Sequence, residues 1–121
     1  MKIGGVVLAT RDVLGLCLVP PLYRTFRTIH VVCSYYELHD TIKTLHPDAA
    51  IVDIELVTLS KINKLARLFP NVRFVCLHRF ATENMWAEAL HAGAADLCFP
   101  DDVAGIIAAL TRDAPISCTA A

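Results

Sequence analysis

Five short apolar stretches recur along the chain, and each is nearly continuous in its hydrophobic residues. They cover residues 3–8, 29–33, 49–53, 72–77 and 95–99. Short, continuous apolar runs are typical of parallel strands that are buried on both faces. The pattern therefore predicts five buried strands, and the segments between them show the spacing of helices.

The clearest helix start lies at residues 34–37, where Ser-Tyr-Tyr-Glu has the pattern of a capping box. In this motif the side chain of Ser34 caps the helix, and Glu37 occupies the third helical position. The helix is expected to end before Pro47. Its apolar face is expected to consist of Leu38, Ile42 and Leu45.

Three later helices show similar boundary patterns. The first of them is marked by Leu59, Ile62, Leu65 and Ala66. The second, at residues 82–92, is closed by Gly93, which suits a left-handed helix end. The third, at residues 103–110, follows Asp101 and Asp102, whose charges favour the positive end of a helix.

The segment after Asp12 is an interrupted helix. Pro20 and Pro21 fall near its middle, where proline removes hydrogen bonds and disfavours a helical conformation at the preceding residue. The sequence predicts either a kink here or two short helices, the second starting near Pro21.

Strands that alternate with helices predict an α/β fold, with a doubly wound parallel sheet covered by helices on both faces. We expect one domain at residues 1–112 and a flexible C-terminal tail at residues 113–121. Sites in such sheets collect beyond the carboxyl ends of the strands. Asp53 closes the third strand, and a charge is costly to place at the end of a buried run, so Asp53 is the first candidate site residue.

Composition excludes several classes of function. Apolar residues make up 55% of the 121 residues and the formal net charge is -1, so neither nonspecific nucleic-acid binding nor attachment to an anionic membrane is indicated. The longest apolar run, residues 13–23, contains Gly15 and two prolines and is too short and broken to span a bilayer. The chain opens directly on a strand-like run without a secretory cleavage pattern, so we expect a cytoplasmic protein.

The cysteines and histidines do not predict a metal site. There are five cysteines, none at metal-ligand spacing, and five histidines without a shared helix face. Cys118 lies in the polar tail and is expected to be an exposed thiol. The remaining cysteines are interpreted as small core residues: Cys17, Cys33, Cys76 and Cys98.

Three stretches resemble the receiver domain of two-component response regulators. They are residues 6–12, at the opening strand; residues 47–54, where a strand ends in an aspartate; and residues 89–96, with an Ala-Gly-Ala turn into the fifth strand. The resemblance covers residues 2 to about 111. It implies a flavodoxin-like, CheY-like fold with the sheet order two-one-three-four-five, and Asp53 at the position of the phosphoacceptor.

The other functional positions that the resemblance implies have been replaced. The acidic pair that holds magnesium in the family falls at Thr10 and Arg11, and a shift by one residue would bring in only a single acid, Asp12. Further family positions, namely the hydroxyl residue, the lysine and the aromatic switch, fall at His78, Pro100 and Leu97. We therefore expect no cofactor, with magnesium binding disfavoured.

Without a metal, a cation of the protein is expected beside Asp53. Arg11 is always protonated and presents a planar fork to carboxylates, and His78 or Arg79 can reach the same crevice. The expectation is an ion pair that lowers the pKa of Asp53 and locks the domain in one state. Blander interpretations stay open: Asp53 as a solvated relic, Arg11 as a surface residue, and His78 as a hydrogen-bonded structural residue, the interpretation favoured for His78.

The resemblance also implies an output surface on helix four, strand five and helix five of the family. Here this surface would include Trp86, Leu97 and Ile106. Trp86, the only tryptophan, is either an interface anchor or a cap on the core. The helix at 103–110 is apolar almost all round, which favours a homodimer or docking to another protein.

The predicted function is a non-enzymatic, phosphorylation-independent interaction module whose partners are proteins of a bacterial signalling pathway. One alternative is a phosphoacceptor that is phosphorylated on Asp53 in a phosphorelay. A second is a small flavodoxin-like ligand binder, which is disfavoured because Gly4 and Gly5 lie inside the first strand and no glycine-rich phosphate loop follows it.

Overall fold

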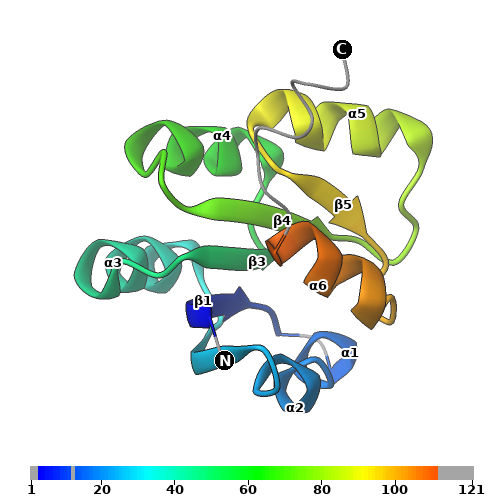
Figure 1. Ribbon diagram of the computed structural model, residues 1–121. Helices are drawn as coiled ribbons and strands as arrows, with labels where there is room; N and C mark the ends of the chain where they lie inside the picture. The colour runs from blue at the N-terminus through cyan, green and yellow to red at the C-terminus, as the bar shows by residue number, and fades with distance from the viewer. Residues whose placement is uncertain (1–2, 12, 112–121) are drawn as a thin grey trace.

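The predicted five-stranded parallel sheet is confirmed. The computed structural model describes residues 3–11 and 13–111, so the predicted tail at 113–121 lies outside the described residues. The strands pair in the order β2-β1-β3-β4-β5, all parallel (Figure 1). They are β1 (Ile3–Ala9), β2 (Phe26–Val32), β3 (Ala49–Asp53), β4 (Arg73–Leu77) and β5 (Asp96–Cys98).

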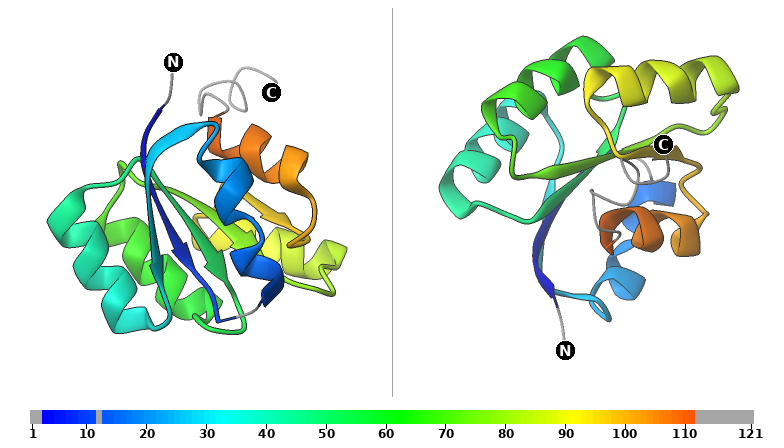
Figure 2. Two further views of the ribbon diagram at one scale, coloured as in Figure 1. Left: turned by 90° about the horizontal axis from the view of Figure 1, so that it is seen from below. Right: turned by 45° about the horizontal axis from the view of Figure 1, so that its top comes forward.

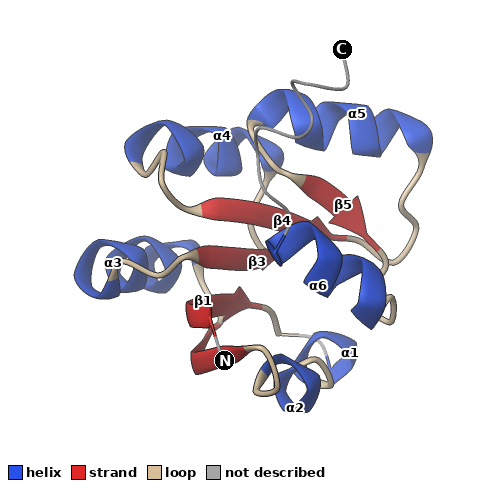
Figure 3. Cartoon of the chain, viewed as in Figure 1, coloured by secondary structure: helices blue, strands red, loops and turns tan. Residues whose placement is uncertain are grey.

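Helices cover both faces of the sheet, as Figures 1 and 2 show. One face carries α1 (Val13–Leu16), α2 (Val19–Leu22) and α6 (Val103–Thr111). The other face carries α3 (Tyr35–Leu45), α4 (Leu59–Leu68) and α5 (Glu83–Ala92). Figure 3 shows how loops join each strand to the helix that follows it. No helix of the described residues is long and apolar enough to cross a membrane.

Two hydrophobic clusters, one on each face of the sheet, form the core. On β1, Val7 and Ala9 belong to the cluster under α3, α4 and α5, while Val6 and Leu8 belong to the cluster under α2 and α6. Successive side chains of a strand point to opposite faces, so a strand buried on both faces must be apolar at every position. This is why β3 and β4 were visible as continuous apolar runs. The expectation of burial on both faces is wrong for β2, which is exposed at four of its seven positions because it lies at the edge of the sheet.

The start of α3 is confirmed, and its last predicted core residue is wrong. The Ser34 side chain accepts a hydrogen bond from the backbone N–H of Glu37 at 3.1 Å, as expected for the cap. Leu38 and Ile42 are fully buried, but Leu45 is 47% exposed. Helical spacing fixes the direction in which Leu45 points, but it does not fix whether another element extends far enough to cover the last turn.

The interrupted first helix is two short helices. Of the two alternatives, the structure therefore confirms the second, with α2 beginning at Val19, two residues before Pro21. Both prolines lie in the first turn of α2, where a missing N–H costs nothing because that donor has no partner within the helix. The break after Leu16 leaves α1 only four residues long.

The predicted glycine end of α5 and acidic start of α6 are confirmed, and the structure adds two threonine caps that the sequence analysis did not name. Thr58 and Thr82 cap α4 and α5 by accepting backbone N–H groups in the first turn. Gly93 ends α5 with φ of 110°, in the left-handed region that favours glycine. Asp102 accepts the backbone N–H of Gly105 at 3.1 Å, so its carboxylate caps the start of α6.

Two of the four cysteines predicted to lie in the core are exposed. Cys76 and Cys98 are buried as expected, and burial raises the pKa of the Cys76 thiol to about 12. Cys17 and Cys33 are exposed because they lie in the break between α1 and α2 and beyond the end of β2. An apolar neighbourhood in sequence did not imply an apolar neighbourhood in space. Cys118 lies outside the described residues.

Candidate functional site

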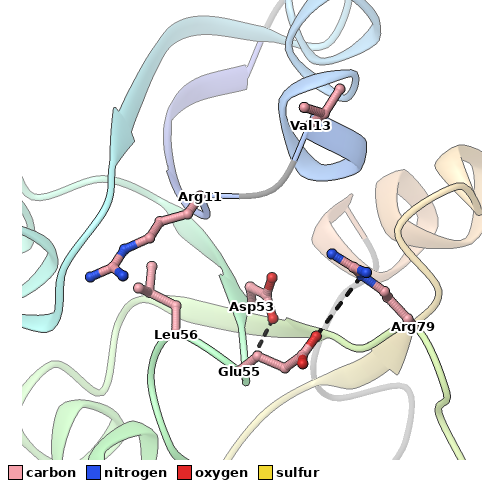
Figure 4. Close-up of a pocket in the computed structure, with 6 residues that line it drawn as sticks. All are labelled: Arg11, Val13, Asp53, Glu55, Leu56 and Arg79. Carbon is pink, nitrogen blue, oxygen red and sulfur yellow. Dashed lines mark hydrogen bonds and ion pairs between the residues drawn. The ribbon is translucent and has the colours of Figure 1, made fainter.

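A pocket of about 370 Å³ lies beyond the carboxyl ends of β1, β3 and β4, and Asp53 faces it (Figure 4). The position agrees with the expectation for Asp53, since β1 and β3 flank the point where the strand order reverses. The pocket is lined by Arg11, Val13, Asp53, Glu55, Leu56 and Arg79.

Asp53 organises the loop that follows β3. Its carboxylate Oδ1 accepts a hydrogen bond from the backbone N–H of Glu55 at 2.9 Å. Its backbone carbonyl accepts the N–H groups of Leu56 and Val57 at 2.9 and 3.0 Å. An aspartate that bonds to the backbone two residues ahead stabilises a tight turn. Asp53 therefore has a structural task in addition to facing the pocket.

The expected pair between Arg11 and Asp53 is wrong. The Arg11 Nε donates a hydrogen bond to the backbone carbonyl of Cys33 at 3.2 Å, and in Figure 4 the guanidinium points away from Asp53. Cys33 follows the last residue of β2, beside the end of β1, so its carbonyl has no partner in the sheet and is free to accept from Arg11. A neighbouring backbone acceptor thus takes the arginine that the sequence assigned to Asp53.

His78 has the structural role that the sequence analysis favoured. Its Nδ1 accepts the backbone N–H of Phe80 at 3.1 Å, and its own backbone N–H donates to the carbonyl of Cys98 at 3.1 Å. Within the described residues His78 makes no ion pair with Asp53. The expected pairing of His78 with Asp53 is therefore wrong, because its ring is engaged by the loop that follows β4.

Arg79 is the cation whose head group faces the acidic side of the pocket. Its Nε lies 4.0 Å from Oε1 of Glu55, and Figure 4 shows the Arg79 side chain directed toward the Glu55 carboxylate. Sequence reasoning missed Glu55, although its place two residues after Asp53 was a usable indication. Both partners of this pair are about half exposed, so water screens it and its contribution to stability is small.

Thr10 does not present a ligand to the pocket. It is 2% exposed, its backbone N–H donates to the carbonyl of Val32 at 3.0 Å, and it packs so closely on Gly15 that a Cβ there would collide with the threonine side chain. Asp12 lies outside the described residues. Among residues 3–11 and 13–111, no three histidine, cysteine or carboxylate side chains come together as a possible metal site.

Pro100 lies in a second, smaller cavity of about 250 Å³, next to the Asp53 pocket. Arg79 lines both cavities, so the two share a wall. The second cavity is lined by Arg79, Phe80, Phe99, Pro100 and Asp101. Pro100, at the position that corresponds to a lysine in the family, is therefore a buried residue in the wall of this cavity.

The expected output surface is only partly exposed. Trp86 is 47% exposed, and its indole N–H donates to Oδ1 of Asp96 at 2.9 Å. Leu97 and Ile106 are 7% and 0% exposed and belong to the two core clusters, so the prediction that they lie on an interaction surface is wrong. On α6, the exposed positions are Ala104, Ala108 and, at the last residue, Thr111.

Comparison with known proteins gives structural likenesses only. No family model and no curated protein matches the sequence. The receiver domain of a two-component response regulator from Bacteroides fragilis is similar, with a TM-score of 0.77 and 17% identity, over 90% of this chain and 94% of that one. A chain of the CheX–CheY complex with BeF3 and magnesium from Borrelia burgdorferi gives a TM-score of 0.76 and 15% identity, over 90% and 87%.

A third similar structure is a response regulator from Burkholderia pseudomallei with a phosphorylated aspartic acid, a calcium ion and citrate. It is 25% identical, with a TM-score of 0.71, over 99% of this chain and 72% of that one. Together with the strand order β2-β1-β3-β4-β5, these likenesses show that this chain has the CheY-like fold of response regulator receiver domains.

Proposed function

We propose that the chain is a receiver-like signalling module that acts through protein contacts, without catalysis of its own and without phosphorylation of Asp53. The observation that carries the proposal is the chemistry around Asp53. Phosphoryl transfer to a carboxylate needs a cation to neutralise the developing charge. At the two positions where the family holds the acidic pair for magnesium, Thr10 is buried against Gly15 and the Arg11 head group bonds to the Cys33 carbonyl. Neither residue therefore provides a carboxylate that could hold the metal ion beside Asp53.

Magnesium does not fit the described residues of the pocket. The ion takes oxygen ligands in octahedral geometry and is usually bound by carboxylates. Asp53 and Glu55 are the carboxylates that line the pocket, but Asp53 bonds to the loop backbone and Glu55 lies beside Arg79. The proposal therefore includes no resident metal ion and routes no chemical step through one.

Intact-mass measurement after incubation with acetyl phosphate and magnesium tests the proposal. The expected result is no phosphate adduct on the wild type or on Asp53→Asn. Asp53→Asn is the matched control because it removes the charge and keeps the size and the carbonyl oxygen that can accept the Glu55 N–H. An adduct on the wild type that is absent from Asp53→Asn would contradict the proposal.

That contrary result would support a second candidate function, a phosphoacceptor in a phosphorelay. It is favoured by one observation: Asp53 is partly exposed in a pocket that is also lined by two arginines, Arg11 and Arg79. Guanidinium groups bind phosphate oxygens well. The similar protein from Burkholderia pseudomallei was solved with a phosphorylated aspartic acid.

The proposed partners are proteins of a bacterial signalling pathway, and the proposed location is the cytoplasm. The similar CheY-containing structure is a complex with CheX, which supports protein partners for the fold. Direct binding of nucleic acid or membrane is not part of the proposal, because the net charge is -1 and provides no strong positive field.

A further inference from the structure

The most exposed phenylalanine of the described residues, Phe80, lines the smaller cavity that shares Arg79 with the Asp53 pocket. Phe80 is 75% exposed and Phe99 is 47% exposed, and both line the cavity of about 250 Å³. Contiguous exposed apolar surface is uncommon on proteins that do not associate. We define the aromatic rim as the lining of this cavity: Arg79, Phe80, Phe99, Pro100 and Asp101.

The two loops that form the aromatic rim are held together by the backbone. The N–H of His78 donates to the carbonyl of Cys98 at 3.1 Å, just before each loop leaves the sheet. The His78 ring accepts the N–H of Phe80 at 3.1 Å, and the N–H of Asp102 donates to the carbonyl of Phe99 at 3.0 Å. The aromatic rings are therefore presented on braced loops, which lowers the entropy lost on association.

The aromatic rim carries one charge of each sign. Arg79 comes from the loop after β4 and Asp101 from the loop after β5. Asp102 is used as a helix cap, whereas the Asp101 carboxylate makes no hydrogen bond or ion pair with any described residue. Arg79 lies near Glu55, but a guanidinium has five N–H donors and can bind a second carboxylate.

We propose that the aromatic rim is the interface of a symmetric homodimer. In a two-fold symmetric contact, residue i of the first copy contacts residue j of the second, and residue j of the first copy contacts residue i of the second. An apolar patch with one cation and one anion is complementary to itself under that symmetry. Arg79 of each copy pairs with Asp101 of the other, and the rings of Phe80 and Phe99 pack between the two ion pairs.

This interface differs from the surface expected on helix four, strand five and helix five of the family. It lies on the loops at the carboxyl end of the sheet, next to the Asp53 pocket, and the two share Arg79. Self-association therefore places a second copy at the mouth of that pocket. The proposal does not depend on whether Asp53 accepts phosphate.

Sedimentation velocity over a concentration series up to about 1 mM tests the dimer, because a dimer with a dissociation constant below about 1 mM is detected in this range. The wild type is expected to approach twice the monomer mass of 13.3 kDa. Phe80→Ser is expected to stay monomeric. The matched control is Tyr36→Ser on α3, which removes an aromatic side chain of equal exposure, 76% against 75%, and is expected to dimerise like the wild type.

Charge exchange tests the two-fold pairing. Arg79→Asp and Asp101→Arg are each expected to be monomeric, because each places like charges opposite one another in both pairs. An equimolar mixture is expected to form a heterodimer, because both of its pairs are then of opposite sign. Circular dichroism confirms that each variant is folded.

A monomeric wild type, a dimer that survives Phe80→Ser, or folded charge variants whose mixture stays monomeric would each overturn the proposal. None of these outcomes bears on phosphate uptake by Asp53. The proposed function and the proposed dimer can therefore fail separately.

Discussion

The contacts of Asp53 reflect competition between backbone groups and charged side chains for the same hydrogen-bond partners. Its carboxylate bonds to the backbone N–H of Glu55, while the nearby Arg11 bonds to the carbonyl of Cys33. Backbone groups at strand ends need partners as much as charged side chains do. At this site the Cys33 carbonyl binds Arg11, the residue that charge alone would have paired with Asp53.

A second local network joins Cys33 to the start of α3. The Cys33 thiol donates to Oε1 of Glu37 at 3.2 Å, and the Cys33 N–H donates to the same oxygen at 3.3 Å. The hydrogen bond and the negative charge of Glu37 raise the pKa of the Cys33 thiol above its usual value. The same contacts lower the pKa of Glu37.

Glu37→Gln is therefore expected to increase the rate at which iodoacetamide alkylates Cys33 near neutral pH. The thiolate is the reactive form, and the variant removes the charge that disfavours it. Peptide mapping after timed alkylation measures the rate. Cys17 is an exposed thiol between α1 and α2 that makes no contact with Glu37, and it serves as the internal control because its rate is expected to stay the same. An unchanged Cys33 rate would show that Glu37 does not control this thiol.

At the scale of single elements, three helix starts depend on contacts that are local in sequence. Ser34, Thr58 and Thr82 each accept an N–H of the first helical turn. Caps act within four residues, so the sequence contains the complete interaction. Burial along a helix is different, because it depends on which other elements lie beside each turn.

Helix α3 allows this difference to be measured with two leucines. Leu38→Ala is expected to lower the free energy of unfolding by about 2–5 kcal/mol, because Leu38 is fully buried in the core. Leu45→Ala on the same helix is expected to change it by no more than about 0.5 kcal/mol, because Leu45 is 47% exposed. Urea denaturation followed by circular dichroism gives both values. Equal losses would contradict the placement of Leu45.

At the scale of the whole molecule, one sheet is shared by two cores. Neighbouring residues of β1 alternate between the cluster under α3, α4 and α5 and the cluster under α2 and α6. If the helices on one face of the sheet unfold, the strands lose half of their buried contacts and can no longer support the core on the other face. The two faces are therefore expected to unfold together.

Leu22→Ala tests this coupling. Leu22 is 1% exposed on α2, and its truncation is expected to cost about 2–5 kcal/mol. Trp86 lies on α5, across the sheet, and is the only tryptophan. In urea, its fluorescence midpoint and the circular dichroism midpoint are expected to fall by the same amount, as in a two-state transition.

The control for this experiment is Leu16→Ala on α1, which is 42% exposed and is expected to shift neither midpoint appreciably. If Leu22→Ala moved the circular dichroism midpoint and left the Trp86 midpoint in place, the two faces would be independent units. Single-domain cooperativity would then be wrong for this chain.

The sequence by itself determined the elements and the location of the site. Continuous apolar runs, helix caps, prolines and glycines act over a few residues, so five strands, the broken first helix and the end of α5 at Gly93 were all predictable. Asp53 was placed at the carboxyl edge of the sheet for the same reason, since it ends an apolar run. The strand order came from the family resemblance and was confirmed by the structure.

Only the tertiary structure decided which groups meet. It exposed Cys17, Cys33 and Leu45, buried Leu97 and Ile106, and turned Arg11 toward the Cys33 carbonyl. It also joined two loops, far apart in sequence, into the aromatic rim. The physical reason is that burial and pairing depend on competition among groups that are distant along the chain, and that competition takes place only once the sheet has brought them together.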